Sequence, residues 1–161
     1  MKPESTIKIF RDEHHFAAAH FLIDMGKCER LHGHNYFLTV ELGGQPDPNG
    51  AIVDFNVINP MIAELCRTFD HKMLIAKEDD RHAITIGADE IEITFKSKRF
   101  VFPKEDCVLV PVQATTVERL SGYFCETLAG HVAPSHPNVE WIEVGVREGS
   151  AQMATYRISI K

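Results

Sequence analysis

Residues 28–36 read Cys-Glu-Arg-Leu-His-Gly-His-Asn-Tyr, and this stretch indicates both the fold and the chemistry of the chain. His32 and His34 stand two residues apart, so an extended backbone would direct both imidazoles to one side. Apolar residues continue this alternation beyond Tyr36, which predicts a strand over about residues 34–42. Two imidazoles on one face of a strand supply half of a metal site.

A second alternating segment precedes this stretch and predicts a neighbouring strand. Its shared face would be formed by Phe16, Ala18, His20 and Leu22. His20, His32 and His34 would then offer three imidazoles with an open fourth position, which is typical of a catalytic zinc site. The chain has nine histidines, so an isolated His-x-His pair also arises by chance, and the residues around it decide the interpretation.

Two helices are expected in the remaining sequence. The first runs from about Pro60 to Arg67, with Asn59 as its cap and Pro60 at its first position, where a missing N–H costs little. The second begins at a capping box formed by Thr115 and Glu118.

Further strands are predicted by alternation over residues 140–147 and 154–160, and strand-like runs at residues 90–95 and 99–102 indicate a hairpin. This order of elements predicts an α+β fold. Its antiparallel four-stranded sheet would carry two helices on one face and an inserted hairpin.

The composition limits the classes of protein to consider. The chain has 161 residues, so one domain over residues 1–161 is expected. Its net charge is -6. An acidic chain has no general attraction for nucleic acid or an anionic membrane surface, and no apolar run is long enough to span a bilayer. The first residues lack the apolar segment of a secretory signal, so the cytoplasm is the expected location.

Cysteines and carboxylates near the histidines add candidate chemistry. Cys28 would lie close to an ion held by His32, where a cation favours the reactive thiolate, although a fourth zinc ligand or an inert thiol are alternatives. Asp70 directly precedes His71, and a neighbouring carboxylate can orient an imidazole for acid–base catalysis. Glu148, at a strand end, could accept hydrogen bonds from adjacent N–H groups of a flat heterocycle. The irregularly spaced cysteines do not indicate a disulfide framework.

Six ordered blocks of sequence together resemble one known family, that of the 6-pyruvoyltetrahydropterin and 6-carboxytetrahydropterin synthases. The blocks are Phe16-x-Ala18-Ala19-His20, Cys28-x-x-x-His32-Gly33-His34-Asn35-Tyr36, Gly50-x-x-Val53-Asp54-Phe55, Asp70-His71, Thr115-Thr116-x-Glu118 and Val146-Arg147-Glu148. They cover most of the chain. The resemblance implies the tunnelling fold, in which subunits of a homo-oligomer, a trimer or hexamer, join their sheets into a barrel with active sites between subunits.

The resemblance also implies roles for individual residues. His20, His32 and His34 would bind Zn²⁺, and Cys28 would move protons with the assistance of Asp70 and His71. Glu148 and Thr116 would bind the pterin triphosphate substrate, with Glu148 anchoring the ring.

The product is predicted from the spacing of Cys28 and His32. A spacing of three residues between them resembles that of the bacterial 6-carboxytetrahydropterin synthases of queuosine and deazapurine biosynthesis. The implied reaction converts 7,8-dihydroneopterin triphosphate to 6-carboxy-5,6,7,8-tetrahydropterin, with release of acetaldehyde and triphosphate. Glu29 keeps side-chain cleavage to 6-hydroxymethyl-dihydropterin for folate synthesis open, and 6-pyruvoyltetrahydropterin synthesis is a further alternative. A zinc-stabilised oligomeric binding module without catalysis is an alternative of another class.

An insert at about residues 77–113 is longer than the compact core of the family requires. It could cover the active site, extend a subunit interface or change the substrate.

Overall fold

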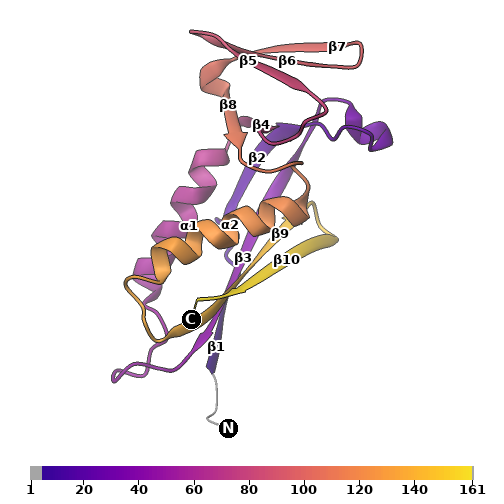
Figure 1. The fold of residues 1–161 in the computed structure, drawn as a ribbon. Helices are drawn as coiled ribbons and strands as arrows, with labels where there is room; N and C mark the ends of the chain where they lie inside the picture. The colour runs from indigo at the N-terminus through magenta and orange to yellow at the C-terminus, as the bar shows by residue number, and fades with distance from the viewer. Residues whose placement is uncertain (1–4, 161) are drawn as a thin grey trace.

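A large mixed sheet forms the framework of the computed structural model, which describes residues 5–160 (Figure 1). The strands are β1 (Ser5–Ile9), β2 (His15–His20), β3 (His32–Gly44), β4 (Lys72–Ala76), β5 (Ala83–Ile86), β6 (Glu90–Phe95), β7 (Lys98–Pro103), β8 (Cys107–Val110), β9 (Val139–Glu148) and β10 (Gln152–Ser159). The helices are α1 (Phe55–Phe69) and α2 (Val117–Val132), and short 3₁₀ turns span Gly26–Glu29 and Lys104–Asp106.

The predicted antiparallel strands are neighbours in this sheet, which has the order β10-β9-β3-β2-β4-β8, with β1 paired to β3. The four predicted strands are present as β10, β9, β3 and β2, and the sheet is larger than predicted because β1, β4 and β8 extend it. Strand β4 pairs in parallel with both β2 and β8. Strand β4 is buried along nearly its whole length. Its sequence therefore lacks the polar and apolar alternation that identified the other strands.

Both helices pack on one face of the sheet, as predicted (Figure 1). The central strand β3 supplies Tyr36, Leu38, Val40 and Leu42 to the core on this face, and each of them is at most 1% exposed. Strand β2 supplies Phe16, whose ring stacks on Tyr36 and meets Phe124 of α2 edge-on. The alternating apolar residues of the sequence thus form a continuous core beneath the helices. Leu22 lies outside β2, which ends at His20.

Helix α1 begins earlier than predicted. Asp54, not Asn59, is its N-cap, and the Asp54 side chain accepts a hydrogen bond from the Asn56 amide at 2.8 Å. Pro60 lies inside the helix rather than at its first position. The stabilising cap at Asp54 and the burial of Ile58 outweigh the loss of one backbone donor at Pro60.

Helix α2 begins one residue later than the capping box predicted. Thr116 is the N-cap, and its hydroxyl accepts a hydrogen bond from the Arg119 amide. Thr115 is buried, and its hydroxyl contacts the imidazole of His20 instead. A tertiary contact therefore decides which of the two adjacent threonines caps the helix.

The segment between β4 and β8 forms a separate sheet in the order β5-β6-β7, which we call the inserted sheet. The predicted hairpin is confirmed as β6 and β7, and β5 is an additional strand. Met73 and Ile75 of β4 pack with apolar residues of the inserted sheet, whereas Leu74 and Ala76 pack in the core under the helices. The inserted sheet thus covers the face of β4 opposite the helices.

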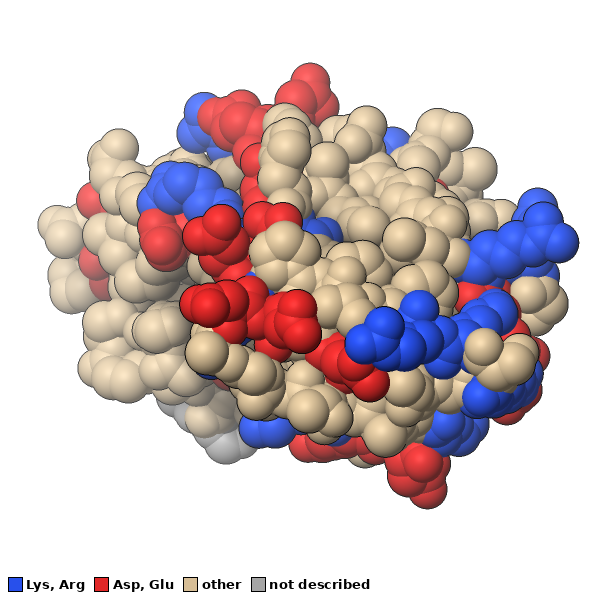
Figure 2. Space-filling view, turned by 90° about the horizontal axis from the view of Figure 1, so that it is seen from above, with Lys and Arg blue, Asp and Glu red and all other residues tan. Residues whose placement is uncertain are grey.

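Charged side chains of both signs occupy the surface seen from the side of the inserted sheet. Figure 2 shows acidic side chains gathered near the middle of this face, with basic side chains beside them and towards one edge. Among the described residues, neither helix has the length and apolar character needed to cross a membrane.

Substitution of Phe124 tests the shared core. The Phe124 ring is fully buried and contacts the rings of Phe16, Phe69 and Tyr123. We expect Phe124→Ala to lower the free energy of unfolding by about 3–5 kcal/mol, because it leaves a cavity among these aromatic rings. Urea denaturation measures the change. The control Ile86→Ala, at a side chain that is 53% exposed, should stay within about 0.5 kcal/mol of wild type. Equal losses in the two variants would contradict this account of the core.

Candidate functional site

Three histidines and one glutamate meet where β2 and β9 end and β3 begins. His20 is the last residue of β2 and lies opposite His32, the first residue of β3, in the antiparallel register. His34 follows two residues later on the same face, and Glu148 ends β9 opposite Tyr36. One ligand atom from each of His20, His32, His34 and Glu148 lies within 4.8 Å of the others. The strand register therefore gathers four potential metal ligands.

Backbone carbonyls orient two of the imidazoles. Nδ1 of His20 lies 3.1 Å from the carbonyl oxygen of Thr115, and Nδ1 of His32 lies 2.6 Å from that of Arg30. Because a carbonyl only accepts hydrogen bonds, each Nδ1 carries the proton, and Nε2 of each ring keeps its lone pair. Metal-binding histidines are commonly held by such contacts on the second ring nitrogen.

Burial favours the neutral form of the His20 and His34 imidazoles. Desolvation, followed by the proximity of His32 and His34, lowers the pKa of His20 to about 4. Desolvation also lowers the pKa of His34, although the Glu148 carboxylate acts in the opposite direction. The Tyr36 hydroxyl lies 3.2 Å from Nε2 of His20, and burial raises its pKa above the usual range. Both shifts favour the neutral imidazole, the form that binds a metal ion, at His20 and His34.

The donor set fits a divalent metal ion. Nε2 of His34 is buried and makes no hydrogen bond to the described residues, and the Glu148 carboxylate contacts it. Oε1 of Glu148 also lies 4.0 Å from Nε2 of His20. A metal ion held between this nitrogen and the carboxylate would satisfy both groups. Imidazole nitrogen and carboxylate oxygen are both ligands of Zn²⁺ and related ions.

Cys28 lies in the loop that joins His20 to His32. Its amide donates to the Met25 carbonyl at 3.1 Å, and its carbonyl accepts from the Leu22 amide at 2.8 Å. The side chain is half-buried and the thiol is free. Its sulfur does not belong to the group of potential metal ligands. The loop therefore joins Cys28 to His20 on one side and to His32 on the other, but the thiol is not one of the potential metal ligands.

Asp70 and His71 form the predicted carboxylate–imidazole pair after α1. Oδ2 of Asp70 lies 2.9 Å from Nδ1 of His71, and Oδ1 accepts a hydrogen bond from the Ala17 amide at 2.8 Å. That amide, assisted by His71, holds the pKa of Asp70 below its usual value. The His71 side chain is 84% exposed.

An open groove of about 580 Å³ lies beside the histidine cluster, and its lining includes His34 and His71. Cys28 is absent from the described residues that line this groove. His71 and His34 therefore line one groove, and Cys28 does not belong to that lining.

Thr115 and Tyr36 belong to the site although sequence reasoning gave neither of them a role there. Both lie within 3.3 Å of the His20 ring. Thr115 lies in the predicted helix-capping segment, and Tyr36 lies on the same predicted strand as His34. No local sequence pattern indicated that either residue would contact His20. Thr116, predicted to bind substrate, caps α2 and lines a cavity of about 100 Å³ with Met25 and Arg81.

Comparison with known proteins places this arrangement in a family. The sequence model of the family named 6-pyruvoyl tetrahydropterin synthase matches residues 9–159. A Methanocaldococcus jannaschii protein with the provisional name 6-carboxy-5,6,7,8-tetrahydropterin synthase is 31% identical over 144 residues, which cover 88% of each chain. The Bacillus subtilis 6-carboxy-5,6,7,8-tetrahydropterin synthase is 32% identical over 77 residues, which cover 44% of this chain and 51% of the relative.

The fold agrees with solved structures. The 6-pyruvoyltetrahydropterin synthase of Plasmodium vivax superposes with a TM-score of 0.92 at 27% identity, covering 98% of this chain and 99% of that one. A mutant of the same enzyme, in which a glutamate described as a catalytic residue is replaced by alanine, superposes equally well. The predicted tunnelling fold is confirmed, and the chain belongs to the 6-pyruvoyl tetrahydropterin synthase family.

Proposed function

We propose that this chain converts 7,8-dihydroneopterin triphosphate to 6-carboxy-5,6,7,8-tetrahydropterin, with release of acetaldehyde and triphosphate, in a Zn²⁺-dependent reaction. The observation that carries the proposal is the group of His20, His32, His34 and Glu148, joined through one loop to Cys28. The names of the M. jannaschii and B. subtilis relatives support the carboxy product.

The three histidines are the proposed metal ligands. The contacts of Nδ1 of His20 and His32 with backbone carbonyls leave Nε2 of both rings suited to coordination. A bound Zn²⁺ would supply Lewis acidity toward the side-chain oxygens of the substrate. Three protein ligands leave a coordination position for the substrate, as catalytic zinc sites require.

Glu148 is proposed to bind the pterin ring. Its carboxylate can accept hydrogen bonds from adjacent N–H groups, and its position beside His34 would bring the ring next to the metal site. A carboxylate so close to the histidines could also serve as a metal ligand, and a neutral substitution separates the two roles.

Cys28 is proposed to move protons, with Asp70 and His71 assisting. Because His71 is exposed and Cys28 does not line its groove, we propose that the Asp70–His71 pair of one subunit serves the site of a neighbouring subunit. Such a site would require a homo-oligomer, a trimer or hexamer. Strand β10 lies at an open edge of the sheet, where pairing with another subunit would cover its free backbone groups.

Side-chain cleavage to 6-hydroxymethyl-dihydropterin is the second candidate function. Glu29 directly follows Cys28, and a glutamate is the catalytic residue named for the P. vivax structure. In this chain Lys96 and Lys98 bind the Glu29 carboxylate. A carboxylate neutralised in this way is a weaker base, so we place the cleavage reaction second.

Replacing Cys28 distinguishes catalysis from a metal-binding role. We expect Cys28→Ala to keep the fold and the bound zinc but to lower kcat for 6-carboxytetrahydropterin formation by about 100-fold or more, because a proton-transfer group is lost. Product analysis by mass spectrometry and metal analysis by atomic emission provide the measurements. Loss of zinc together with folding would instead indicate a structural cysteine in a non-catalytic module. Formation of 6-hydroxymethyl-dihydropterin that persists in Cys28→Ala and disappears in Glu29→Ala would favour the second function.

Removal of the metal tests the histidine cluster. We expect dialysis against a chelator to abolish turnover and added Zn²⁺ to restore it. His32→Ala should lower the zinc content of the purified protein, whereas His131→Ala, at an exposed histidine remote from the cluster in sequence, should leave it unchanged. Full activity of the metal-free enzyme would refute the zinc requirement.

Glu148→Gln distinguishes ring binding from metal binding. The amide keeps the shape of the side chain but loses the charge and one acceptor site. We expect zinc to be retained and KM for the pterin to rise about tenfold, the effect of losing roughly one hydrogen bond to a charged group. Steady-state kinetics and metal analysis of the same preparation check this. Loss of zinc with an unchanged KM would make Glu148 a metal ligand instead.

A further inference from the structure

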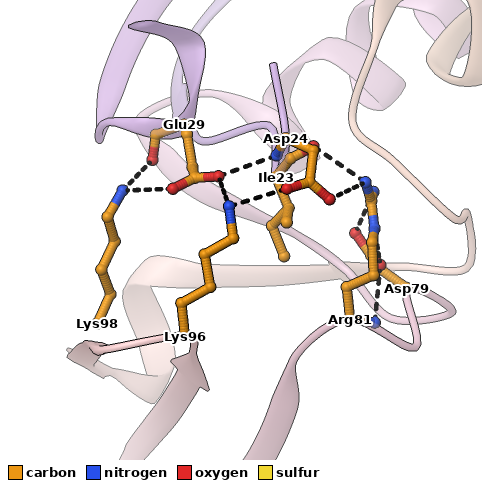
Figure 3. Close-up of polar contacts among 7 residues, drawn as sticks. All are labelled: Ile23, Asp24, Glu29, Asp79, Arg81, Lys96 and Lys98. Atoms are coloured by element: carbon orange, nitrogen blue, oxygen red, sulfur yellow. Dashed lines mark hydrogen bonds and ion pairs between the residues drawn. The ribbon is translucent and has the colours of Figure 1, made fainter. Parts of the chain in front are cut away.

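The loop that carries Cys28 is tied to the inserted sheet by a network of charges (Figure 3). The Glu29 carboxylate contacts Lys96 Nζ at 2.5 Å and Lys98 Nζ at 3.1 Å. The same carboxylate accepts a hydrogen bond from the Asp24 amide at 2.9 Å. Lys98 Nζ also contacts the Glu29 carbonyl oxygen at 3.2 Å. Both the side chain and the backbone of the residue after Cys28 are therefore held.

The network continues along the start of the same loop. Lys96 also contacts Asp24 at 2.8 Å, and Arg81 lies 3.6 Å from the other oxygen of Asp24. Arg81 donates to the Ile23 carbonyl at 3.0 Å and is itself held by the largely buried Asp79. Figure 3 shows the two loop carboxylates lying between the cationic side chains. The inserted sheet and the segment before it thus fix the loop at several points.

The carboxylate at the centre of the network is sheltered and remains ionised. The Glu29 side chain is only 15% exposed, compared with 59% for Asp24. Its contacts with Lys96, the Asp24 amide and Lys98 lower its pKa to about 2. The negative charge that the lysines bind is consequently present across the whole physiological pH range.

Lys96 occupies a backbone conformation that a lysine rarely adopts. It begins the two-residue turn between β6 and β7 with φ of 50°, in the left-handed region that glycine and asparagine prefer. Glycine at this position would relieve the steric cost. The presence of lysine at this position is explained by its two ion pairs, which glycine cannot make.

We propose that Lys96 and Lys98 are positioning residues that hold Glu29, and through it Cys28, in the geometry for proton transfer. The proposal rests on the function proposed for Cys28. It also gives the inserted sheet a role, because the turn of its hairpin reaches the catalytic loop. Glu29 in this arrangement anchors the loop and does not itself transfer protons.

The test removes the two charges without damaging the turn. The double variant Lys96→Gly/Lys98→Met has a turn residue suited to φ of 50° and keeps an unbranched side chain at position 98. We expect kcat of the zinc-loaded enzyme to fall about tenfold with KM within about twofold of wild type, because misplacement of a reacting group affects turnover more than binding. Lys98→Arg in the wild-type background should retain activity. The melting temperature of the double variant should stay well above the assay temperature, so that unfolding does not explain the loss of kcat.

A second measurement follows the thiol directly and does not depend on the pterin reaction. The rate of Cys28 alkylation by iodoacetamide, quantified by peptide mass spectrometry, should rise about fivefold in the double variant because a loop without its ion pairs opens more often. Alkylation of Cys107, a half-buried thiol outside the loop, serves as the internal reference. Arg99→Met is the matched control, since Arg99 lies on the same hairpin but pairs with Glu92.

The outcomes separate the possible roles. Unchanged kcat and unchanged Cys28 alkylation in the double variant would overturn the proposal. A rise in KM with kcat preserved would also overturn it, because it would indicate that the lysines bind the substrate triphosphate. Equal effects in Arg99→Met would indicate only a weakened hairpin, which again contradicts a positioning role. If wild type forms no pterin product, the proposed function fails, whereas the alkylation rates still decide whether the lysines hold the loop.

Discussion

The candidate site depends on the antiparallel pairing of β2 with β3. This register places His20 opposite His32 and Phe16 opposite Tyr36, so the histidine pair and the aromatic pair lie on the same face. Phe16 and Tyr36 are fully buried and stack with ring centroids 5.0 Å apart. A shift of one residue would move a whole set of side chains to the opposite face of the sheet. Burial of the aromatic pair therefore fixes the register that gathers the potential metal ligands.

Strand pairing does not by itself position the thiol. Cys28 lies in a long connection between the paired histidines, where no strand ladder constrains the chain. Hydrogen bonds tie the connection near its ends, from the Leu22 amide to the Cys28 carbonyl and from the His32 ring to the Arg30 carbonyl. Glu29 lies between these contacts and is held from the inserted sheet. The potential metal ligands thus depend on the main sheet, whereas the position of the thiol depends on contacts between its loop and the inserted sheet.

Features that depend on local periodicity could be predicted from the sequence, and features that depend on tertiary contacts could not. The alternation around Tyr36 predicted strand β3 and the shared face of His32 and His34. No local pattern indicated that β4 would pair in parallel with β2, because the partners are far apart in sequence and β4 is buried on both faces. Thr115 was likewise predicted as a helix cap, yet its hydroxyl contacts His20.

Glu29 illustrates how environment decides the role of a residue. Its position beside Cys28 makes it a candidate base by sequence alone. A general base works best when its pKa lies near the working pH, and the lysines move the pKa of Glu29 far below that range. The same ion pairs that weaken Glu29 as a base make it a firm anchor for the loop. The inserted sheet therefore makes Glu29 a poor proton carrier, and the proposed role falls to the adjacent thiol of Cys28.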